Sequence, residues 1–355
     1  MKRFAASILM LLAAAPASAG AADEPATLFA RGAYRRAATA AERVLAAAPT
    51  DASALVVLAR VRAREARLDD ARELSEQAVK AAPSSADAHY ALAEVSGMRA
   101  RAGGILRGLG PARTLKREAE AALEIDPRHA DALNLLIQFH GAAPGIVGGD
   151  KKQAAALTER LLVADPARAW FARAQDAMRE KDSTRAGECW RKAYETETQG
   201  ARARVNLASW LAQTRQDIPG AERLAKQATE LEPWRIGGWQ VLAGVQAHEH
   251  RWTELEATFA ASEAATGGRR EAWHTAATQL LLEKVEPARA ERYLRYYLER
   301  EPEIGSFSFA ATHWRIAQSL EQQSRVPEAI AELQAALKLD PKFEPAKKDL
   351  KRLKG

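Results

Sequence analysis

Two histidines two residues apart, His248 and His250, have a spacing that first suggests a metal site. On a helix, side chains two positions apart point about 200° away from one another, so this pair could share an ion only across a loop. A zinc site needs about four ligands at defined spacing, and no further ligand cluster accompanies the pair. We interpret the histidines as a contact where a helix ends, and we expect no metal and no other cofactor.

The glycine-rich segment 145–150 resembles a phosphate-binding loop at first sight. It lacks the Gly-Lys-Ser/Thr ending of such loops, and no β-strand is expected before it. Asp150, the last residue of the segment, instead suits the N-cap of a helix that begins at Lys151. We therefore expect a structural turn here.

Nucleophilic catalysis has equally little support. The single cysteine, Cys189, lies between Glu188 and Trp190 in an expected helix, where a small packed residue is more typical than a nucleophile. The motif Gly-x-Ser-x-Gly is absent, and carboxylates are scattered along the chain. We expect no enzymatic activity. The alternative is a catalytic or ligand-binding site that only the fold assembles.

The charge of the chain does not indicate nucleic acid as a partner. Its 355 residues carry a formal net charge of +6. The most basic stretch, residues 60–67, is interleaved and followed by acidic side chains, whereas nucleic-acid binding requires a clustered basic face.

Residues 1–19 have the pattern of a secretory signal peptide. Lys2 and Arg3 precede an apolar run that is too short to span a bilayer comfortably, and residues 17–19 form an A-x-A cleavage site. One cysteine permits no intramolecular disulfide. We expect cleavage after Ala19 and a soluble protein in a bacterial periplasm; the alternative is an uncleaved membrane anchor.

Small side chains recur along the chain, most often 34 or 35 residues apart. Prolines follow the same spacing, and the step from Pro49 to Pro83 is 34 residues. A period in the range of about 20–50 residues indicates a stacked array of repeats, and apolar residues at i, i+3, i+4 and i+7 indicate helices. The recurring positions are Ala37, Ala71, Ala154, Ala186, Ala221, Leu255, Ala290 and Ala329.

This pattern resembles the tetratricopeptide repeat, a helix–turn–helix unit of 34 residues. The second helix matches best, as in Ala71, Ala78 and Pro83. The turn glycine of the family is often replaced, as at Lys181, Val285 and Ser324. The resemblance implies an all-α fold: a right-handed α-solenoid of about nine such repeats over residues 20–343, with a capping helix at residues 344–355.

Three repeats are longer than 34 residues, with inserts near residues 101–111, 141–150 and 303–309. Inserts in a solenoid map to loops on one face, which is often a functional one. The first two inserts carry apolar residues, among them Leu106 and Val147. These side chains are expected either to fold back onto the array or to contact a partner.

The resemblance also implies a concave groove, lined by defined positions of the first helix of each repeat. Amide side chains at such positions suit an extended backbone or a helix, and tryptophan supplies contact area. We expect partner binding between residues 168 and 322. The residues carried onto the groove are Arg168, Phe171, Gln175, Asn206, Trp210, Gln213, Gln240, His248, Thr275, Gln279, Trp314 and Gln318.

Together these features predict a non-catalytic periplasmic scaffold that binds a protein or peptide during cell-envelope assembly or secretion. The competing prediction is a ligand-binding protein or enzyme built on the helical array. A ligand-binding protein should have a closed pocket with convergent charges, whereas an adaptor should have an open polar groove. The repeated glutamines favour the adaptor.

Overall fold

The computed structural model describes residues 24–197 and 200–355, and all regular secondary structure in these residues is helical. The helices pair along the chain into nine antiparallel hairpins, followed by a terminal helix α18 (Glu344–Lys354). The predicted all-α solenoid is therefore confirmed. The signal-peptide prediction falls on residues outside the described part. No helix within the described residues is long and apolar enough to cross a membrane.

The first helices of the hairpins are α1 (Pro25–Ala30), α3 (Ala52–Arg64), the first half of α5 (Ala86–Ile125), α6 (Ala130–Ala142), α8 (Pro166–Arg179), α10 (Arg202–Thr214), α12 (Ile236–His248), α14 (Glu271–Glu283) and α16 (Phe309–Gln322). The second helices are α2 (Tyr34–Ala47), α4 (Leu68–Ala81), the second half of α5, α7 (Lys151–Ala164), α9 (Ser183–Thr196), α11 (Ile218–Leu231), α13 (Trp252–Thr266), α15 (Pro287–Leu298) and α17 (Val326–Leu339).

The recurring small residues lie where the two helices of a hairpin pack together. Six of the seven alanines at these positions have no exposed surface, and Leu255 at the eighth position is buried just as completely. A methyl group at this position lets two helices approach closely and bury their apolar faces. Ala154 in α7 is the exception, because it is half-buried and lines a pocket described below.

The turns inside the hairpins contain a residue with positive φ, a conformation that costs about 1–2 kcal/mol for a residue other than glycine. Gly32 occupies this position in the first hairpin, whereas Lys181 and Ser324 occupy it later with φ of 60° and 62°. In the α14–α15 turn the residue is Lys284, not the predicted Val285. The pattern places the turn but misassigns this one position.

The insert near residues 101–111 is not a loop, contrary to our expectation. The segment is helical on both sides of Gly104, where φ of 62° and ψ of −163° reverse the chain. Helix α5 therefore consists of two antiparallel helices, and His89 on one contacts Glu118 on the other at 2.7 Å. Gly108 approaches the Ala100 carbonyl so closely that a Cβ would lie 2.5 Å from its oxygen. The insert thus lengthens both helices of the third hairpin.

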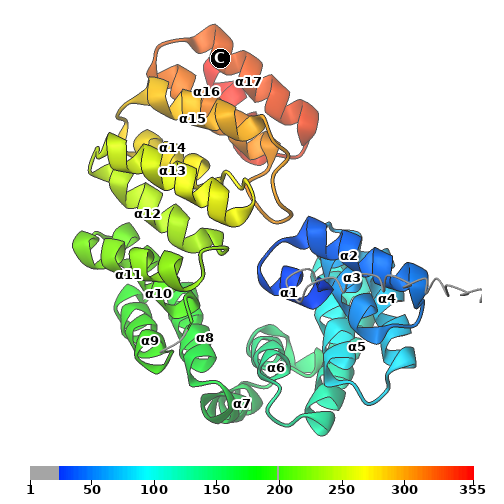
Figure 1. Cartoon of the computed structure of the whole chain (residues 1–355). Helices are drawn as coiled ribbons and strands as arrows, with labels where there is room; N and C mark the ends of the chain where they lie inside the picture. Colours follow the sequence, from blue (N-terminus) through cyan, green and yellow to red (C-terminus); the bar gives the residue numbers. More distant parts are fainter. Residues whose placement is uncertain (1–23, 198–199) are drawn as a thin grey trace, which may run out of the picture.

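The array closes on itself, which the sequence did not predict (Figure 1). The first hairpin lies against the turns that follow α11, α13 and α15, and we call this contact, between residues 28–36 and residues 234, 265–271 and 299–304, the seam. Arg35 Nη2 lies 2.6 Å from Glu301 Oε1, and Glu303 Oε1 accepts a hydrogen bond of 3.2 Å from the Arg35 amide. Ile304 packs against the buried cluster that contains Leu28.

The loop between α15 and α16 that reaches the seam is anchored at its far end by His274 of α14. The Phe307 ring stacks on the His274 ring with centroids 3.8 Å apart, and the Phe307 carbonyl accepts a hydrogen bond of 2.8 Å from the Tyr297 hydroxyl. Ser306 Oγ donates to Glu271 Oε1 at 2.5 Å. Burial of the His274 ring lowers its pKa to about 3, so the ring stays neutral in the folded protein.

His274 should make the protein less stable in acid. Because its pKa falls from an ordinary 6.5 to about 3 on folding, its contribution is complete above pH 6.5 and decreases as the pH falls below that value. We expect the free energy of unfolding to be about 2 kcal/mol lower at pH 5 than at pH 7.5 from this group. Urea unfolding of His274→Phe at both pH values, with the parent protein measured in parallel, should show this difference reduced. An equal pH dependence in His274→Phe would contradict the assignment.

The seam should open when its ion pairs are reversed or screened. Arg35 and Glu301 are both exposed, and exposed ion pairs contribute about 0–1 kcal/mol each and weaken with salt. We expect Arg35→Glu, or 0.5 M NaCl with the parent protein, to increase the radius of gyration in small-angle X-ray scattering. Arg43→Glu, two turns further along α2, is the matched control. An unchanged radius in Arg35→Glu would show that the polar contacts do not hold the seam.

Candidate functional site

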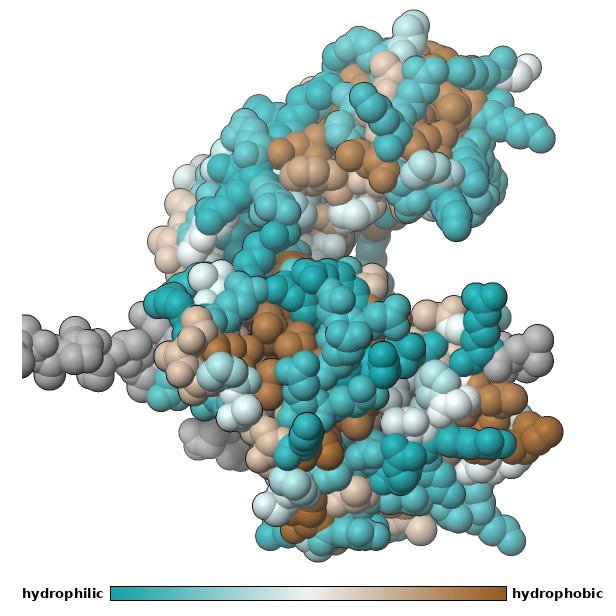
Figure 2. All heavy atoms as spheres, turned by 90° about the vertical axis from the view of Figure 1, so that its right-hand side faces the viewer, coloured by the Kyte–Doolittle hydropathy of each residue, from teal (hydrophilic) through white to brown (hydrophobic). Residues whose placement is uncertain are grey.

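The inner layer of the array is formed by the first helices of the hairpins, which contact one another from repeat to repeat in most of the chain. Seen from the side, the C-terminal repeats stand above the N-terminal repeats with a hollow between them, and most of the visible surface is hydrophilic (Figure 2). The predicted groove residues lie on α8, α10, α12, α14 and α16 of this layer.

Four of the predicted residues form a polar row along α12 and α14. Gln240 Nε2 donates to Thr275 Oγ1 at 3.2 Å, and Thr275 Oγ1 in turn donates to the Glu271 carbonyl. About two turns further on, His248 Nδ1 lies 2.5 Å from Glu283 Oε1, to which Gln279 Nε2 also donates at 2.9 Å. All four predicted side chains are half-buried, so each still offers polar atoms at the surface.

Glu283 organises this row and was missed by the sequence analysis. Its carboxylate is largely buried and also receives Arg215 from the C-terminal end of α10 at 2.7 Å. Three donors from three helices therefore meet one carboxylate. The signal that could have found it is its position, four residues after Gln279 on the same helix face. The other histidine of the pair, His250, stacks on Trp252 instead, so the two rings have different partners.

Toward the C-terminus the predicted residues contact the chain itself. The Trp314 indole Nε1 donates to Asp349 Oδ2 of α18 at 2.7 Å, and its ring meets Phe343 edge to face. Gln318 accepts a hydrogen bond of 2.9 Å from Arg315 Nη1. The capping helix thus uses the indole that we had expected to anchor a partner.

The predicted residues of α8 and α10 are only partly brought together. Arg168 pairs with Asp131 and Asp165, and its side chain joins Phe171 and Asn206 around a small cavity of 40 Å³. Phe171 also packs against Trp190. Gln175 is half-buried, and Gln213 is exposed at the end of α10.

Trp210 does not line the groove, and this prediction was wrong. Its side chain is 6% exposed and belongs to the buried cluster between α9, α10 and α11. The indole lies directly over Gly187 of α9, where a Cβ would be 2.3 Å from two ring carbons. A bulky ring in a first helix can point either to the groove or to the paired helix, and only the absence of a Cβ at Gly187 decides between them.

The first two inserts meet around one pocket of 960 Å³. Its walls come from the middle of α5, the end of α6, the 3₁₀ turn at Gly145–Val147 and helix α7. The lining is mainly glycine, alanine and aliphatic side chains, including Leu109, Leu135 and Val147, with charged groups such as Lys151 and Glu180 also contributing. The side chain of Leu106 lies outside the described part.

The 3₁₀ turn presents Ile146 at the edge of this pocket with 89% of its side chain exposed. The turn itself is fixed, because the Asp150 amide donates to the His140 carbonyl at 3.1 Å and Asp150 caps α7 as predicted. Helix α7 therefore begins at a defined point, and an apolar side chain is held in solvent beside an apolar pocket. Such a surface is typical of an interaction site.

The fold and these surfaces define a helical-repeat protein of the kind that binds other proteins. Residues 28–95 match the family model of the tetratricopeptide repeat, so this part of the chain carries tetratricopeptide repeats and the predicted resemblance is confirmed there. Proteins of this kind are generally non-catalytic scaffolds. No group of three or more metal-ligating side chains occurs in residues 24–197 and 200–355.

Solved structures with a similar fold come from several sources. Yeast Tom70 is 15% identical, with a TM-score of 0.52 over 93% of this chain and 80% of that one. A tetratricopeptide-repeat protein of the bacterium Thermus thermophilus is 24% identical over 53% of this chain and 95% of its own, with a TM-score of 0.46. Pseudomonas aeruginosa pilF is 19% identical over 67% and 99%, with a TM-score of 0.40. Comparison with curated proteins gives no match.

The contact between Gly187 and Trp210 generates a stability prediction. A methyl group at residue 187 would overlap the indole, so Gly187→Ala should lower the free energy of unfolding by about 1–3 kcal/mol. Gly110→Ala is the control, because Gly110 lies in α5 with open space around its Cα. That change should be neutral or stabilising by up to about 1 kcal/mol through helix propensity. Urea unfolding of the two variants, monitored by tryptophan fluorescence and circular dichroism, tests the prediction. Equal unfolding midpoints for Gly187→Ala and Gly110→Ala would rule out the close contact between Gly187 and the Trp210 indole.

Proposed function

We propose that this protein is an exported, non-catalytic scaffold that binds an apolar segment of a partner protein during cell-envelope assembly or secretion. Export is supported by the signal-peptide pattern of residues 1–19. Binding rather than catalysis is supported by the tetratricopeptide repeats and by a pocket lined mainly by apolar side chains.

The observation that carries the proposal is the pocket between the two inserts. A solenoid of standard repeats buries most of its apolar side chains between hairpins, and Ile146 is the most exposed of the large apolar residues in the described part of this chain. Here the third hairpin is extended and the fourth has a 3₁₀ turn, and the space between them remains open. A volume of 960 Å³ accommodates several aliphatic or aromatic side chains, such as those on one face of a helix.

The polar row on α12 and α14 supplies a second contact for the same partner. Gln240, Thr275 and Gln279 offer half-exposed amide and hydroxyl groups that can hydrogen-bond a peptide backbone. The row is preorganised, because Glu283 fixes His248 and Gln279 before any partner binds. Preorganised side chains reduce the entropic cost of association. The insert pocket is thus the anchor, and the row contributes orientation.

In-cell photo-crosslinking tests the proposal. A photo-reactive residue at Val147 should capture a specific protein, which mass spectrometry identifies, and probes at Gln279 or Gln318 should capture the same protein more weakly. In the Val147 probe background, Ile146→Asp should reduce the crosslinked product at least tenfold, because a carboxylate at the edge opposes burial of the partner's apolar face.

Val163→Asp provides the matched control for this experiment. Val163 lies in α7 with 77% of its side chain exposed, outside the pocket lining. The crosslinked product should persist in this variant. A product that is lost equally in both variants, or one obtained only from Gln279 and Gln318, would move the interface away from the insert pocket. Saturable binding of a small apolar molecule with no protein captured from any position would reject the scaffold proposal in favour of a ligand-binding protein.

A further inference from the structure

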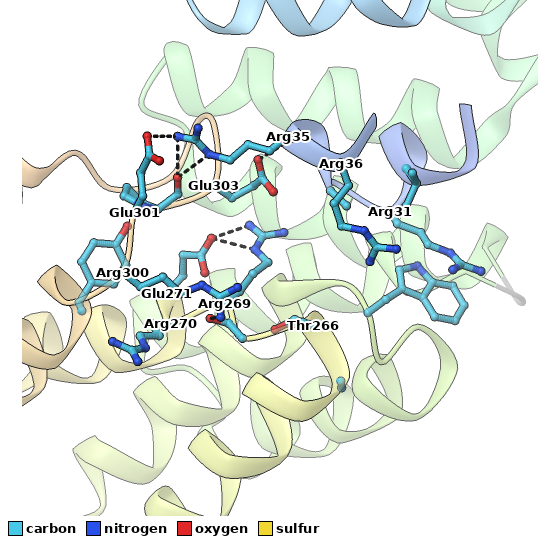
Figure 3. A pocket seen from close by; sticks show the side chains of 18 residues that line it. Arg31, Arg35, Arg36, Thr266, Arg269, Arg270, Glu271, Arg300, Glu301 and Glu303 are labelled. Carbon is cyan, nitrogen blue, oxygen red and sulfur yellow. Dashed lines mark hydrogen bonds and ion pairs between the residues drawn. The ribbon is translucent and has the colours of Figure 1, made fainter. Parts of the chain in front are cut away.

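A second pocket, of 480 Å³, lies in the seam and differs in character from the insert pocket (Figure 3). Its described lining contains six arginines and three glutamates. Arg31, Arg35 and Arg36 come from the first hairpin, whereas Arg269, Arg270 and Arg300 come from the turns on the opposite side of the seam. Arginines of two distant chain segments therefore line one space, and Figure 3 shows Arg31 at one side of it and Arg269, Arg270 and Arg300 at the other.

The three glutamates are fewer than the arginines, so positive charge is in excess among the lining residues, and each glutamate already accepts hydrogen bonds within the seam. Arg269 donates to Glu271 through Nε and Nη2, at 2.9 and 2.6 Å, and Glu271 also accepts from Ser306. Glu301 pairs with Arg35. Glu303 accepts from the backbone amides of Arg35 and Ile304 at 3.2 and 2.9 Å.

Two arginines, one on each side of the seam, are left without a carboxylate partner among the described residues. The Arg31 guanidinium lies over the Trp234 ring at 5.0 Å, and Arg300 donates only to the Gly268 carbonyl at 2.9 Å. A cation over an aromatic ring keeps its N–H groups free for an in-plane acceptor. Guanidinium groups in this arrangement suit oxyanions, which they bind through paired hydrogen bonds.

We propose that the seam pocket binds a small polyanion, carrying two or more carboxylate or phosphate groups, and that this ligand holds the ring closed. An anion that contacts Arg31 and Arg300 together can do so only when the first hairpin lies against the turns. Its binding free energy therefore favours the closed ring over the open one. This site is independent of the partner-binding proposal, since it shares no residue with the insert pocket.

Calorimetric titration of the mature protein with inorganic pyrophosphate and with citrate, at ionic strength held constant with NaCl, tests the site. We expect saturable binding of one equivalent of at least one probe, and the tighter probe assigns phosphate or carboxylate chemistry. Arg31→Ala combined with Arg300→Ala should weaken binding at least tenfold. Arg128→Ala, an exposed arginine on the α5–α6 turn, should keep the affinity within twofold. If the double variant does not fold by circular dichroism, Arg300→Ala alone, at an exposed side chain, carries the same test with at least a threefold loss.

Hydrogen–deuterium exchange then separates a bridging ligand from one bound to a single side. The bound probe should slow exchange both in residues 34–47 and in residues 299–308. Protection on one side only would overturn the proposal that the anion holds the ring closed. Absence of saturable binding, or equal affinity in the parent and the double variant, would overturn the site itself.

Discussion

The close packing of two helices at a single small side chain is the constraint on which this structure depends. At positions such as Ala37, Ala186 and Ala329 the side chain is completely buried, so a larger residue would push the two helices apart. The same hairpin geometry repeated nine times in the described residues generates a steady curvature. That curvature brings the first hairpin round to the turns after α11, α13 and α15, which lie more than two hundred residues away in the sequence. Closure is therefore a result of local packing summed over the chain.

The local part of the fold could be predicted from the sequence because local patterns determine it. The spacing of small residues and prolines located the hairpins, and Asp150 marked the start of α7 correctly. The third hairpin was misjudged because glycines at 103, 104, 108 and 110 suggest a loop, whereas only Gly104 breaks the helix. The others are helical, and Gly108 permits close approach to the opposite helix. Closure of the ring could not be predicted, because it depends on small angles between repeats that leave no residue pattern.

In the candidate site, too, local repeat register could be predicted from the sequence, whereas contacts between distant helices could not. Gln240, His248, Thr275 and Gln279 come together as a row, since repeat register alone places them on adjacent first helices. Trp210 does not line the groove, because its direction depends on Gly187 in another helix. Trp314 is half-buried and donates a hydrogen bond to Asp349 of α18, so its role in partner binding stays a prediction. We expected an open polar groove in an adaptor and a closed charged pocket in a ligand-binding protein. This criterion does not distinguish the two functions here. The molecule has a polar row and a charged pocket at different places, so scaffold and ligand-binding roles are compatible in one chain.

The seam also changes how the array loses its structure. In a linear solenoid the first repeat has one neighbour, and unfolding starts at the ends because a terminal repeat gives up a single interface. Here the first hairpin also contacts the seam through Arg35 and Ile304. Its unfolding therefore disrupts two interfaces, one with the second hairpin and one across the seam. Helices α16, α17 and α18 lie beyond the seam and gain no second neighbour from it among the described residues. Loss of order should therefore begin in these helices rather than in the first hairpin, and α18 stabilises them through the hydrogen bond between Asp349 and Trp314.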